Sequence, residues 1–293
     1  MERKYSMESL YQHIGKTRQS VYNANLRFSE KQHIENSLLT LARHWRDSHP
    51  QMGSRVLYHT LKNKGVDMPI GINAFENLLS RNGLQAQRIK RFIPLTSDGK
   101  GKSNYPNLTN GLVLNNICQL IVADITYFWL CDKWAHLFVV KDVYSQRLLG
   151  LYPSWDMKAE SAIKALHQAL STQQKERFLN CIHHSDNGSQ YHSKLYRKIL
   201  DNHQIKISRA KSCEENGSCE QMNHMIKNMY LRHYAPHNME ALLKACKKVK
   251  HLLNKERGVA QLGYKTVEEF ELKISKMNPN QRPKKELYDF NQN

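Results

Sequence analysis

The stretch HHSDNGSQY, residues 183–191, decides how the rest of the chain is interpreted. The apolar run before it, residues 178–182, predicts a buried strand. Asp186 stands where that strand ends, and Asn187-Gly188 is a typical turn pair. Open α/β sheets bind their ligands in the crevice beyond the carboxyl ends of the strands. Asp186 is therefore a candidate for chemistry, although a turn with no chemical role explains this stretch equally well.

A second carboxylate lies in the most apolar run of the chain, LIVADITYFWL at residues 120–130. Such a run predicts a central strand that is buried on both faces. Asp124 is its only charged residue, and burying an unpaired carboxylate is costly. A cation is expected to compensate it, either a metal ion in a site or a neighbouring arginine or lysine.

A third carboxylate, Glu220, lies on a helix predicted over residues 218–231. Apolar side chains recur there at helical spacing: Met222, Met225, Ile226, Met229 and Tyr230. Ser218 is expected to open this helix as a capping box. Glu220, Asn223 and Lys227 then share the opposite face, which is either simply solvated or part of a site.

These motifs resemble the retroviral-integrase-like catalytic core of bacterial insertion-sequence transposases. The matching segments are DITY at 124–127, DVYSQR at 142–147, HSDNGSQY at 184–191, SR at 208–209 and QLGYKTVEEF at 261–270. Asp186 and Glu220 are 34 positions apart, close to the spacing of the family, and Lys227 matches a basic residue of the same helix. The closest subgroup makes its transposase from two overlapping reading frames, and this chain is similar to the second-frame product. Glu214 departs from the pattern, because the family usually has tryptophan there.

The resemblance implies that Asp124, Asp186 and Glu220 are the catalytic residues of a DDE-type polynucleotidyl transferase. They would hold two Mg²⁺ ions, with Mn²⁺ as a substitute, because magnesium prefers oxygen ligands. Two such ions stabilise the entering and leaving oxygens of a displacement at phosphorus. When water is the entering group, the DNA is cut and a 3′-OH is left. When that 3′-OH is the entering group, the end of the insertion sequence is joined to new DNA. The supporting residues would be Thr126, His184, Asn187 and Gly188.

The charge of the chain favours a polyanionic partner, since the net charge is +18 and the pI is near 9.6. The expected partner is double-stranded DNA, both the ends of the element and the target. The predicted DNA contacts are Lys227, Asn223, Arg209, Lys211, Arg55, Arg88, Lys90 and Arg91. The family further implies a homo-oligomer on DNA and a possible first-frame transposase product as partner. A catalytically weak or domesticated DNA-binding relative and a ribonuclease-H-type nuclease are the alternatives.

The fold class predicted is α/β, a ribonuclease-H-like mixed-sheet catalytic core with an N-terminal all-α helix-turn-helix-like region. Three antiparallel strands followed by alternating helices and strands support it. The predicted units are a helical arm (1–28), a helix-turn-helix-like DNA-binding region (29–92), a linker (93–116), the catalytic core (117–235), its C-terminal helical extension (236–276) and a polar tail (277–293). A plain helical bundle is the alternative for residues 29–92, and the tail is expected to be disordered.

Six cysteines occur without a Cys-x-x-Cys pair, and no apolar run approaches 18 residues. These features predict reduced thiols in a cytoplasmic protein that does not enter a membrane, and the resemblance implies that it is bacterial and nucleoid-associated. Retroviral integrases carry an N-terminal zinc module, but the first 117 residues here contain no cysteine, so that module is not expected.

Overall fold

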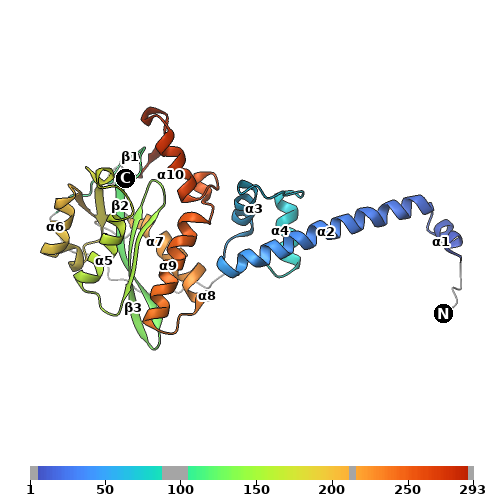
Figure 1. Ribbon diagram of the computed structural model, residues 1–293, viewed down its shortest axis with the longest axis horizontal. Coiled ribbons are helices and arrows are strands. Elements are labelled where there is room, and N and C mark those ends of the chain that lie inside the picture. Colours follow the sequence, from blue (N-terminus) through green and yellow to red (C-terminus); the bar gives the residue numbers. More distant parts are fainter. Residues whose placement is uncertain (1–5, 88–104, 211–215, 290–293) are drawn as a thin grey trace.

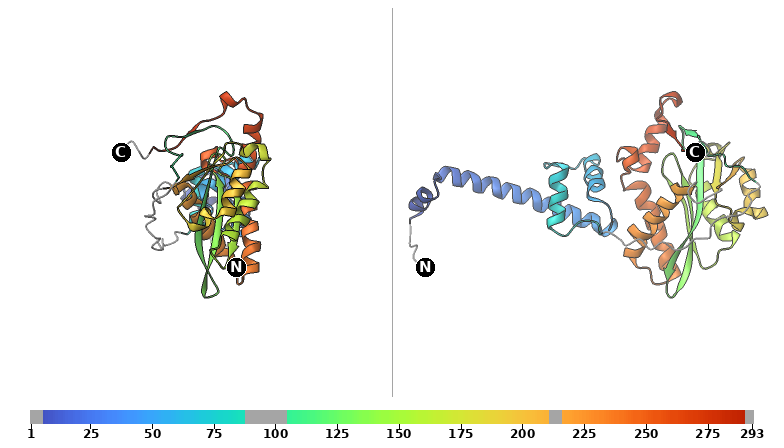
Figure 2. Two further views of the ribbon diagram at one scale, coloured as in Figure 1. Left: turned by 90° about the vertical axis from the view of Figure 1, so that its left-hand side faces the viewer. Right: turned by 180° about the vertical axis from the view of Figure 1, so that it is seen from behind.

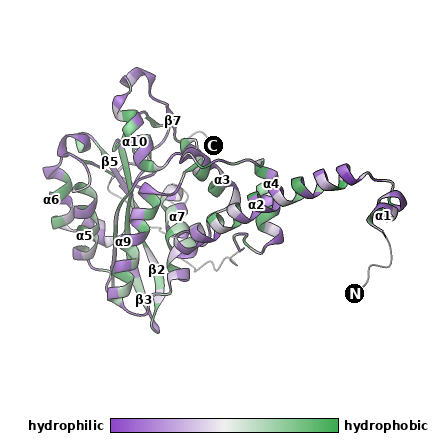
Figure 3. Ribbon diagram, turned by 45° about the vertical axis from the view of Figure 1, so that its right-hand side comes forward, coloured by the Kyte–Doolittle hydropathy of each residue, from purple (hydrophilic) through white to green (hydrophobic). Residues whose placement is uncertain are grey.

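The computed structural model describes residues 6–87, 105–210 and 216–289. Its larger part is an α/β body built on a five-stranded sheet, and a smaller all-helical region lies beside that body (Figure 1). Figure 3 shows hydrophobic residues concentrated in the central strands, whereas the outer helices mix hydrophobic and hydrophilic residues. The predicted fold class, a mixed α/β core with an all-α region before it, is confirmed.

Four helices form the N-terminal region: α1 (Met7–His13), α2 (Arg18–Ser48), α3 (Ser54–Asn63) and α4 (Ile72–Arg81). The second half of α2 packs with α3 and α4 around a small apolar core that includes Ala42, Met52 and Phe75. The first half of α2 carries no buried residue. It extends away from the body, with α1 at its far end (Figures 1 and 2).

Helix α2 is continuous, whereas the sequence predicted separate helical segments over residues 7–27 and 29–48. Thr17 opens it by accepting a hydrogen bond from the backbone N–H of Ser20. No glycine or proline occurs between residues 18 and 48, so nothing in the backbone stops the helix at residue 28. The predicted division between residues 28 and 29 therefore falls inside one helix.

The central sheet consists of β2 (Leu120–Leu130), β3 (Lys133–Asp142), β4 (Leu148–Ser154), β5 (Ile182–Ser185) and β6 (Lys206–Arg209). Its strand order is β4-β3-β2-β5-β6. The first three strands are antiparallel, as the sequence predicted, and β5 and β6 run parallel to β2. Strand β5 begins later than predicted, because residues 175–178 form a 3-10 turn and Asn180 has a φ of 60°.

Helices cover this sheet and connect its parallel strands. Between β4 and residue 234 lie α5 (Ala159–Leu170), the 3-10 turns η1 (Lys175–Phe178) and η2 (Ser189–His192), α6 (Lys194–Asn202), α7 (Gly217–His224), the π-helix η4 (Met225–Leu231) and α8 (Arg232–Tyr234). The C-terminal part adds α9 (Met239–Lys255), η5 (Ala260–Leu262), α10 (Val267–Lys276) and η6 (Pro279–Gln281). Helix α7 begins at Gly217, and Ser218 makes no capping hydrogen bond. The predicted capping box is therefore wrong.

The tail and part of the predicted linker meet on the surface of the core. β1 (Val113–Leu114) pairs with β7 (Lys285–Glu286) in a two-stranded antiparallel sheet. Tyr144 donates a hydrogen bond to the carbonyl oxygen of Pro283, which fixes the tail to the body. The expectation of a disordered tail is therefore wrong for residues 278–289. Local composition could not reveal this pairing, because each partner strand is only two residues long.

The helical region docks on the core through aromatic and histidine side chains. His49 is buried, and its Nδ1 lies 2.8 Å from the hydroxyl of Tyr230 in η4. The hydroxyl of Tyr234 donates to the carbonyl oxygen of Ser48 at 2.5 Å. Farther along, the rings of His59 and Tyr264 stack with centroids 4.1 Å apart. The segment around Tyr264, which matched the family pattern in the sequence, thus anchors α3.

Candidate active site

The three predicted carboxylates are carried to one end of the sheet by three different elements. β2 and β5 are parallel neighbours, with Ala123 paired to Ser185. Asp124 and Asp186 are the next residues of these segments, so they occupy corresponding positions on chains about 4.8 Å apart. Glu220 comes from α7, which packs against β2 and β3. Sheet register alone thus brings together two residues that lie 62 positions apart in the sequence.

The pKa of the Asp124 carboxyl group reflects the charges that lie near it. Burial, together with the charges of Asp186 and Glu220, raises the pKa of this carboxyl group from 3.8 to about 7. A hydrogen bond of 2.5 Å from Asn223 Nδ2 to Asp124 Oδ2 acts in the opposite direction. The site therefore gathers negative charge around a carboxylate that has little access to water.

The donor set fits a hard divalent cation by its chemistry. All three side chains offer carboxylate oxygen, the ligand type that Mg²⁺ prefers. No ion pair joins Asp124 to an arginine or lysine in the part of the chain that the structure describes. Within that same part, no three histidine, cysteine, aspartate or glutamate side chains form a ready-made metal cluster. A cation would relieve the repulsion between the carboxylates and draw them together.

The turn after β5 holds Asp186 in place. The backbone N–H of Gly188 donates a hydrogen bond to Asp186 Oδ1 at 3.1 Å. A Cβ atom at position 188 would lie 3.1 Å from that same oxygen and 2.9 Å from Gln190 Oε1, so a side chain there would disturb the carboxylate. Although Asp186 is exposed overall, partial burial of the carboxyl group raises its pKa, against the lowering effects of Gly188, Arg209 and His192. Asn187 Oδ1 accepts a hydrogen bond from His192 Nε2 across 2.8 Å, which steadies the other side of the turn.

The predicted face of the Glu220 helix points at β2. Asn223 is only 5% exposed and binds Asp124, as described above. One turn later, Lys227 Nζ donates to Thr126 Oγ1 at 2.6 Å. Burial lowers the pKa of Lys227, with Arg232 adding to the effect. Both side chains therefore line the site from the protein side, and their predicted contacts with DNA stay predictions.

Lys141 is a neighbour of the site that the sequence did not single out. It lies in β3, is buried, and donates from Nζ to the carbonyl oxygen and the hydroxyl of Ser218 at 3.1 and 3.0 Å. Burial lowers the pKa of this ammonium group to about 8. It fastens the start of α7, and hence Glu220, to the sheet. A lone charge in an apolar run identified Asp124, but Lys141 lacks that signal, because Asp142 follows it directly in the same strand.

Two predicted site residues have positions in the interior. Arg209 is 0% exposed, donates to the Ser185 hydroxyl and to the carbonyl oxygen of Tyr191, and lies against the ring of Tyr191. The prediction that Arg209 contacts DNA does not fit this position, because its guanidinium group holds β5, β6 and η2 together. His184 is also buried, with Nδ1 2.9 Å from Ser208 Oγ, so it supports the strand that carries Asp186.

The other predicted DNA contacts are distant from the carboxylates or outside the described residues. Arg55 is exposed on α3 and forms an ion pair with Glu76 at 3.0 Å. Residues 88–104 and 211–215 lie outside the description, and with them Arg88, Lys90, Arg91 and Lys211. Glu214, the departure from the family pattern, is outside it as well.

The motif at 142–147 forms a buried network rather than part of the site. Asp142 accepts hydrogen bonds from the backbone N–H of Cys118 and from the N–H and hydroxyl of Ser145. Ser145 Oγ also lies 2.7 Å from Glu271 Oε1 of α10, so its single proton serves one of the two carboxylates at a time, and Glu271 pairs with Arg147 at 2.8 Å. This network ties the β3–β4 turn to the C-terminal helices and explains why these residue types occur together.

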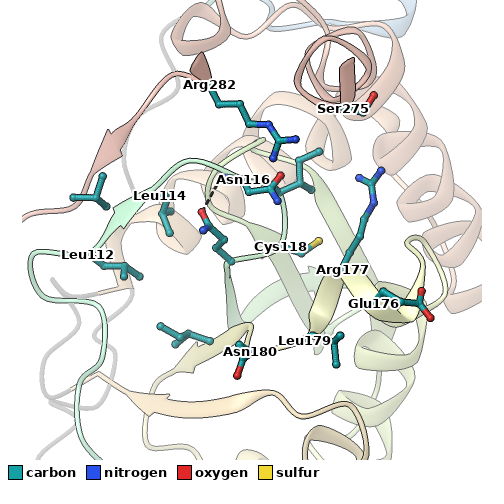
Figure 4. A pocket seen from close by; sticks show the side chains of 14 residues that line it. Leu112, Leu114, Asn116, Cys118, Glu176, Arg177, Leu179, Asn180, Ser275 and Arg282 are labelled. Carbon is teal, nitrogen blue, oxygen red and sulfur yellow. Dashed lines mark hydrogen bonds between the residues drawn. The ribbon is translucent and has the colours of Figure 1, made fainter. Parts of the chain in front are cut away.

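A cavity of about 580 Å³ lies at the opposite end of the sheet (Figure 4). Residues at the beginning of β2 and β5, among them Cys118 and Ile182, line it, together with Arg177 and Arg282. Because β2 and β5 are parallel, this cavity is at the far end of both strands from Asp186. It is therefore separate from the carboxylate site.

Residues 117–213 match the family described as integrase core domain. A protein of Shigella sonnei described as an uncharacterized 31 kDa protein of insertion element IS600 is 29% identical over 215 residues, covering 72% of this chain and 78% of that protein. Transposase InsF for insertion sequence IS3A of Escherichia coli strain K12 is 28% identical over 200 residues, covering 67% of each chain.

A similar solved structure is the HTLV-2 integrase catalytic core domain in complex with magnesium, in a trimeric form. It is 22% identical in sequence, with a TM-score of 0.43, and the match covers 55% of this chain and 99% of that one. No helix among the described residues is long and apolar enough to cross a membrane.

Proposed function

We propose that this chain, a relative of insertion-sequence transposases with an integrase core domain, cuts the ends of an insertion sequence and joins them to new DNA. The observation that supports the proposal is that Asp124 and Asp186 hold corresponding positions on two adjacent parallel strands, and that the charges of Asp186 and of Glu220, on a helix packed on β2, both raise the pKa of Asp124. The match of residues 117–213 to the integrase core domain includes the first two of these carboxylates and supports the same activity.

The three carboxylates would hold two Mg²⁺ ions, or Mn²⁺ in their place. When bound, such ions supply charge stabilisation for the entering and leaving oxygens of an in-line displacement at phosphorus. The protein fixes the geometry around them. Asn223 orients Asp124 through the bond to Oδ2, and the Gly188 N–H orients Asp186. Lys227, held by Thr126 at 2.6 Å, places a cation where a phosphate would approach the carboxylates.

Each reaction is one exchange of bonds at phosphorus. In cleavage, a water oxygen bonds to the phosphorus, the bond from phosphorus to the 3′ oxygen breaks, and that oxygen takes up a proton. In joining, the freed 3′-OH loses its proton, bonds to a phosphorus of the target, and a 3′ oxygen of the target leaves. Neither reaction needs a covalent link between protein and DNA.

The partners would be the double-stranded ends of the element and the target duplex. The helical region, which we propose to be a helix-turn-helix-like DNA-binding unit, docks on the core through His49 and Tyr230. It would therefore position DNA relative to the carboxylates. Assembly into a homo-oligomer on DNA, and cooperation with a first-frame transposase product, are parts of the same proposal.

The deciding experiment follows hydrolysis and joining separately on a labelled duplex in Mg²⁺. The wild-type protein should cut the duplex and join its 3′-OH, and chelation of the metal should stop both reactions. Asp186→Asn should lose both, whereas Glu160→Gln, which changes an exposed carboxylate on α5, should lose neither. Hydrolysis without joining would instead indicate a nuclease, and DNA binding without either reaction would indicate a domesticated relative.

A further inference from the structure

A basic groove of about 600 Å³ lies on the outer edge of the sheet, between α6 and β6. Its lining residues are Tyr105, Lys194, Arg197, Lys198, Asp201, Ile205, Lys206 and Ile207. We propose that this groove binds the phosphodiester backbone of the duplex DNA that leads into the carboxylate site. The proposal rests on the proposed function, since it assigns a path to the DNA on which that site acts.

The charges of the groove favour a polyanion. Four cations face one carboxylate, Asp201, among the described residues that line it. No ion pair joins Lys194, Arg197 or Lys198 to a carboxylate in the described ranges, so their charges are available to a ligand. Such unpaired cations release counterions when they contact phosphates, which is the main source of affinity for DNA.

The geometry of α6 aligns these charges. Lys194, Arg197 and Lys198 are spaced i, i+3 and i+4, so they form a ridge on one face of the helix. Lys206 faces them from β6, the edge strand of the sheet. The groove is open and its lysines are exposed, which suits an extended backbone better than a small, enclosed anion.

A chain of contacts joins the groove to the candidate active site. Arg197 Nη1 donates to the hydroxyl of Tyr105 across 3.4 Å, and the ring of Tyr105 lies 6.4 Å from that of His192. His192 Nε2 is 2.8 Å from Asn187 Oδ1, and Asn187 follows Asp186 directly. DNA held along α6 would therefore run towards the turn that positions this carboxylate.

The test compares two triple variants that lose the same charge. The groove variant is Lys194→Gln/Arg197→Gln/Lys198→Gln, and the control is Lys247→Gln/Lys273→Gln/Lys276→Gln, which changes exposed lysines of α9 and α10. Affinity for a short fluorescent duplex is measured without metal over a series of salt concentrations. The groove variant should bind roughly 10-fold or more weakly at moderate salt, and the slope of log affinity against log salt should fall by about 2 to 3. The control should change far less.

Equal losses in both variants would overturn the proposal, because they would reflect net charge alone. Lys206→Gln, from the opposite wall, should weaken binding further when it is added to the groove variant. Joining by the groove variant should need more DNA but reach nearly the wild-type rate at saturation, and a lower rate at saturation would contradict a role in binding alone. A wild-type protein that neither cuts nor joins would refute the proposed function, whereas this binding comparison would still decide the groove.

Discussion

The carboxylate site and the contact between the helical region and the core both bury titratable side chains, but they arrange them in opposite ways. At the carboxylate site, Asp124 is half-buried near two groups of the same charge. At the helical contact, His49 is buried between complementary groups, with Tyr230 2.8 Å from one ring nitrogen and Glu256 3.5 Å from the other. The ring of Trp45 stacks on it as well.

This difference indicates that the contact between the helical region and the core stabilises the fold, whereas the carboxylate site serves the activity. Like charges in a place with little water cost stability, and they are retained where a function requires them. A neutral histidine with hydrogen-bonding and stacking partners stabilises the contact that it fills. Substitutions in the first region should therefore reduce activity and spare the fold, and substitutions in the second should do the reverse.

The largest effect is expected from Asp124→Asn. Because the variant loses a charge that would balance a divalent cation, joining should fall on the order of a thousandfold. In the absence of metal the variant should melt at the same temperature or higher, since the change relieves repulsion by Asp186 and Glu220. Joining rates and thermal melting without metal measure the two effects. A variant that loses stability and activity together would contradict the contrast between the regions.

The next effect is expected at the helical contact. His49→Ala should lower the free energy of unfolding by about 2–3 kcal/mol, because it leaves a cavity and removes the partner of a buried Tyr230 hydroxyl. Chemical denaturation measures the loss. His44→Ala, an exposed histidine of the same helix, is the matched control and should change little. If both variants are equally stable, the His49 contact does not contribute to the fold.

A smaller and graded effect should appear with pH. Burial and the nearby Arg257 lower the pKa of His49 from 6.5 to about 3 in the folded state. The unfolded chain therefore binds more protons below pH 6.5, so stability should fall as the pH decreases from there towards 3. One such group contributes at most about 1.4 kcal/mol per pH unit.

His49→Gln should reduce that pH slope by up to this amount. Part of the slope should remain in both proteins, because the pKa of His183 is also lowered to about 3. Denaturation curves between neutral and mildly acidic pH measure the slopes. Identical slopes in wild type and variant would mean that His49 takes up protons equally well in the folded state.

The smallest effect is expected from Gly188→Ala. The new Cβ would meet Asp186 Oδ1 at 3.1 Å, so the carboxylate should shift by a few tenths of an ångström. Small misplacements near the reacting atoms slow catalysis, here by roughly tenfold, with little loss of stability. Gly53→Ala, where no atom lies within 4 Å of the added Cβ, is the control for joining rate. Equal rates in the two variants would remove Gly188 from the support of Asp186.

Much of the core was predictable because its signals are local. The lone carboxylate in the apolar run at 120–130 and the strand end at Asp186 both follow from periodicity and turn chemistry, and the resemblance to insertion-sequence transposases is confirmed by the comparisons. The order of three antiparallel strands before alternating helices and strands was also predicted correctly.

Tertiary contacts decide two of the errors, and the continuity of α2 is the third. A basic residue such as Arg209 looks like a DNA contact in sequence, yet partners 18 and 24 residues away bury it. The polar tail gains order from a partner strand of two residues, β1, which has no periodicity to detect. The spacing of apolar residues could not predict the full length of helix α2, because the exposed first half of this helix packs against no core.

The central claim is that the three carboxylates form one catalytic site, and Glu220 tests it most directly. It is exposed on α7, so Glu220→Gln removes a charge without removing core packing. The measurement is the rate at which a duplex with a pre-cut 3′-OH end is joined to target DNA in Mg²⁺. The account predicts that Glu220→Gln binds this DNA as wild type does but joins it about a thousandfold more slowly or not at all. Joining by Glu220→Gln at nearly the wild-type rate would contradict it.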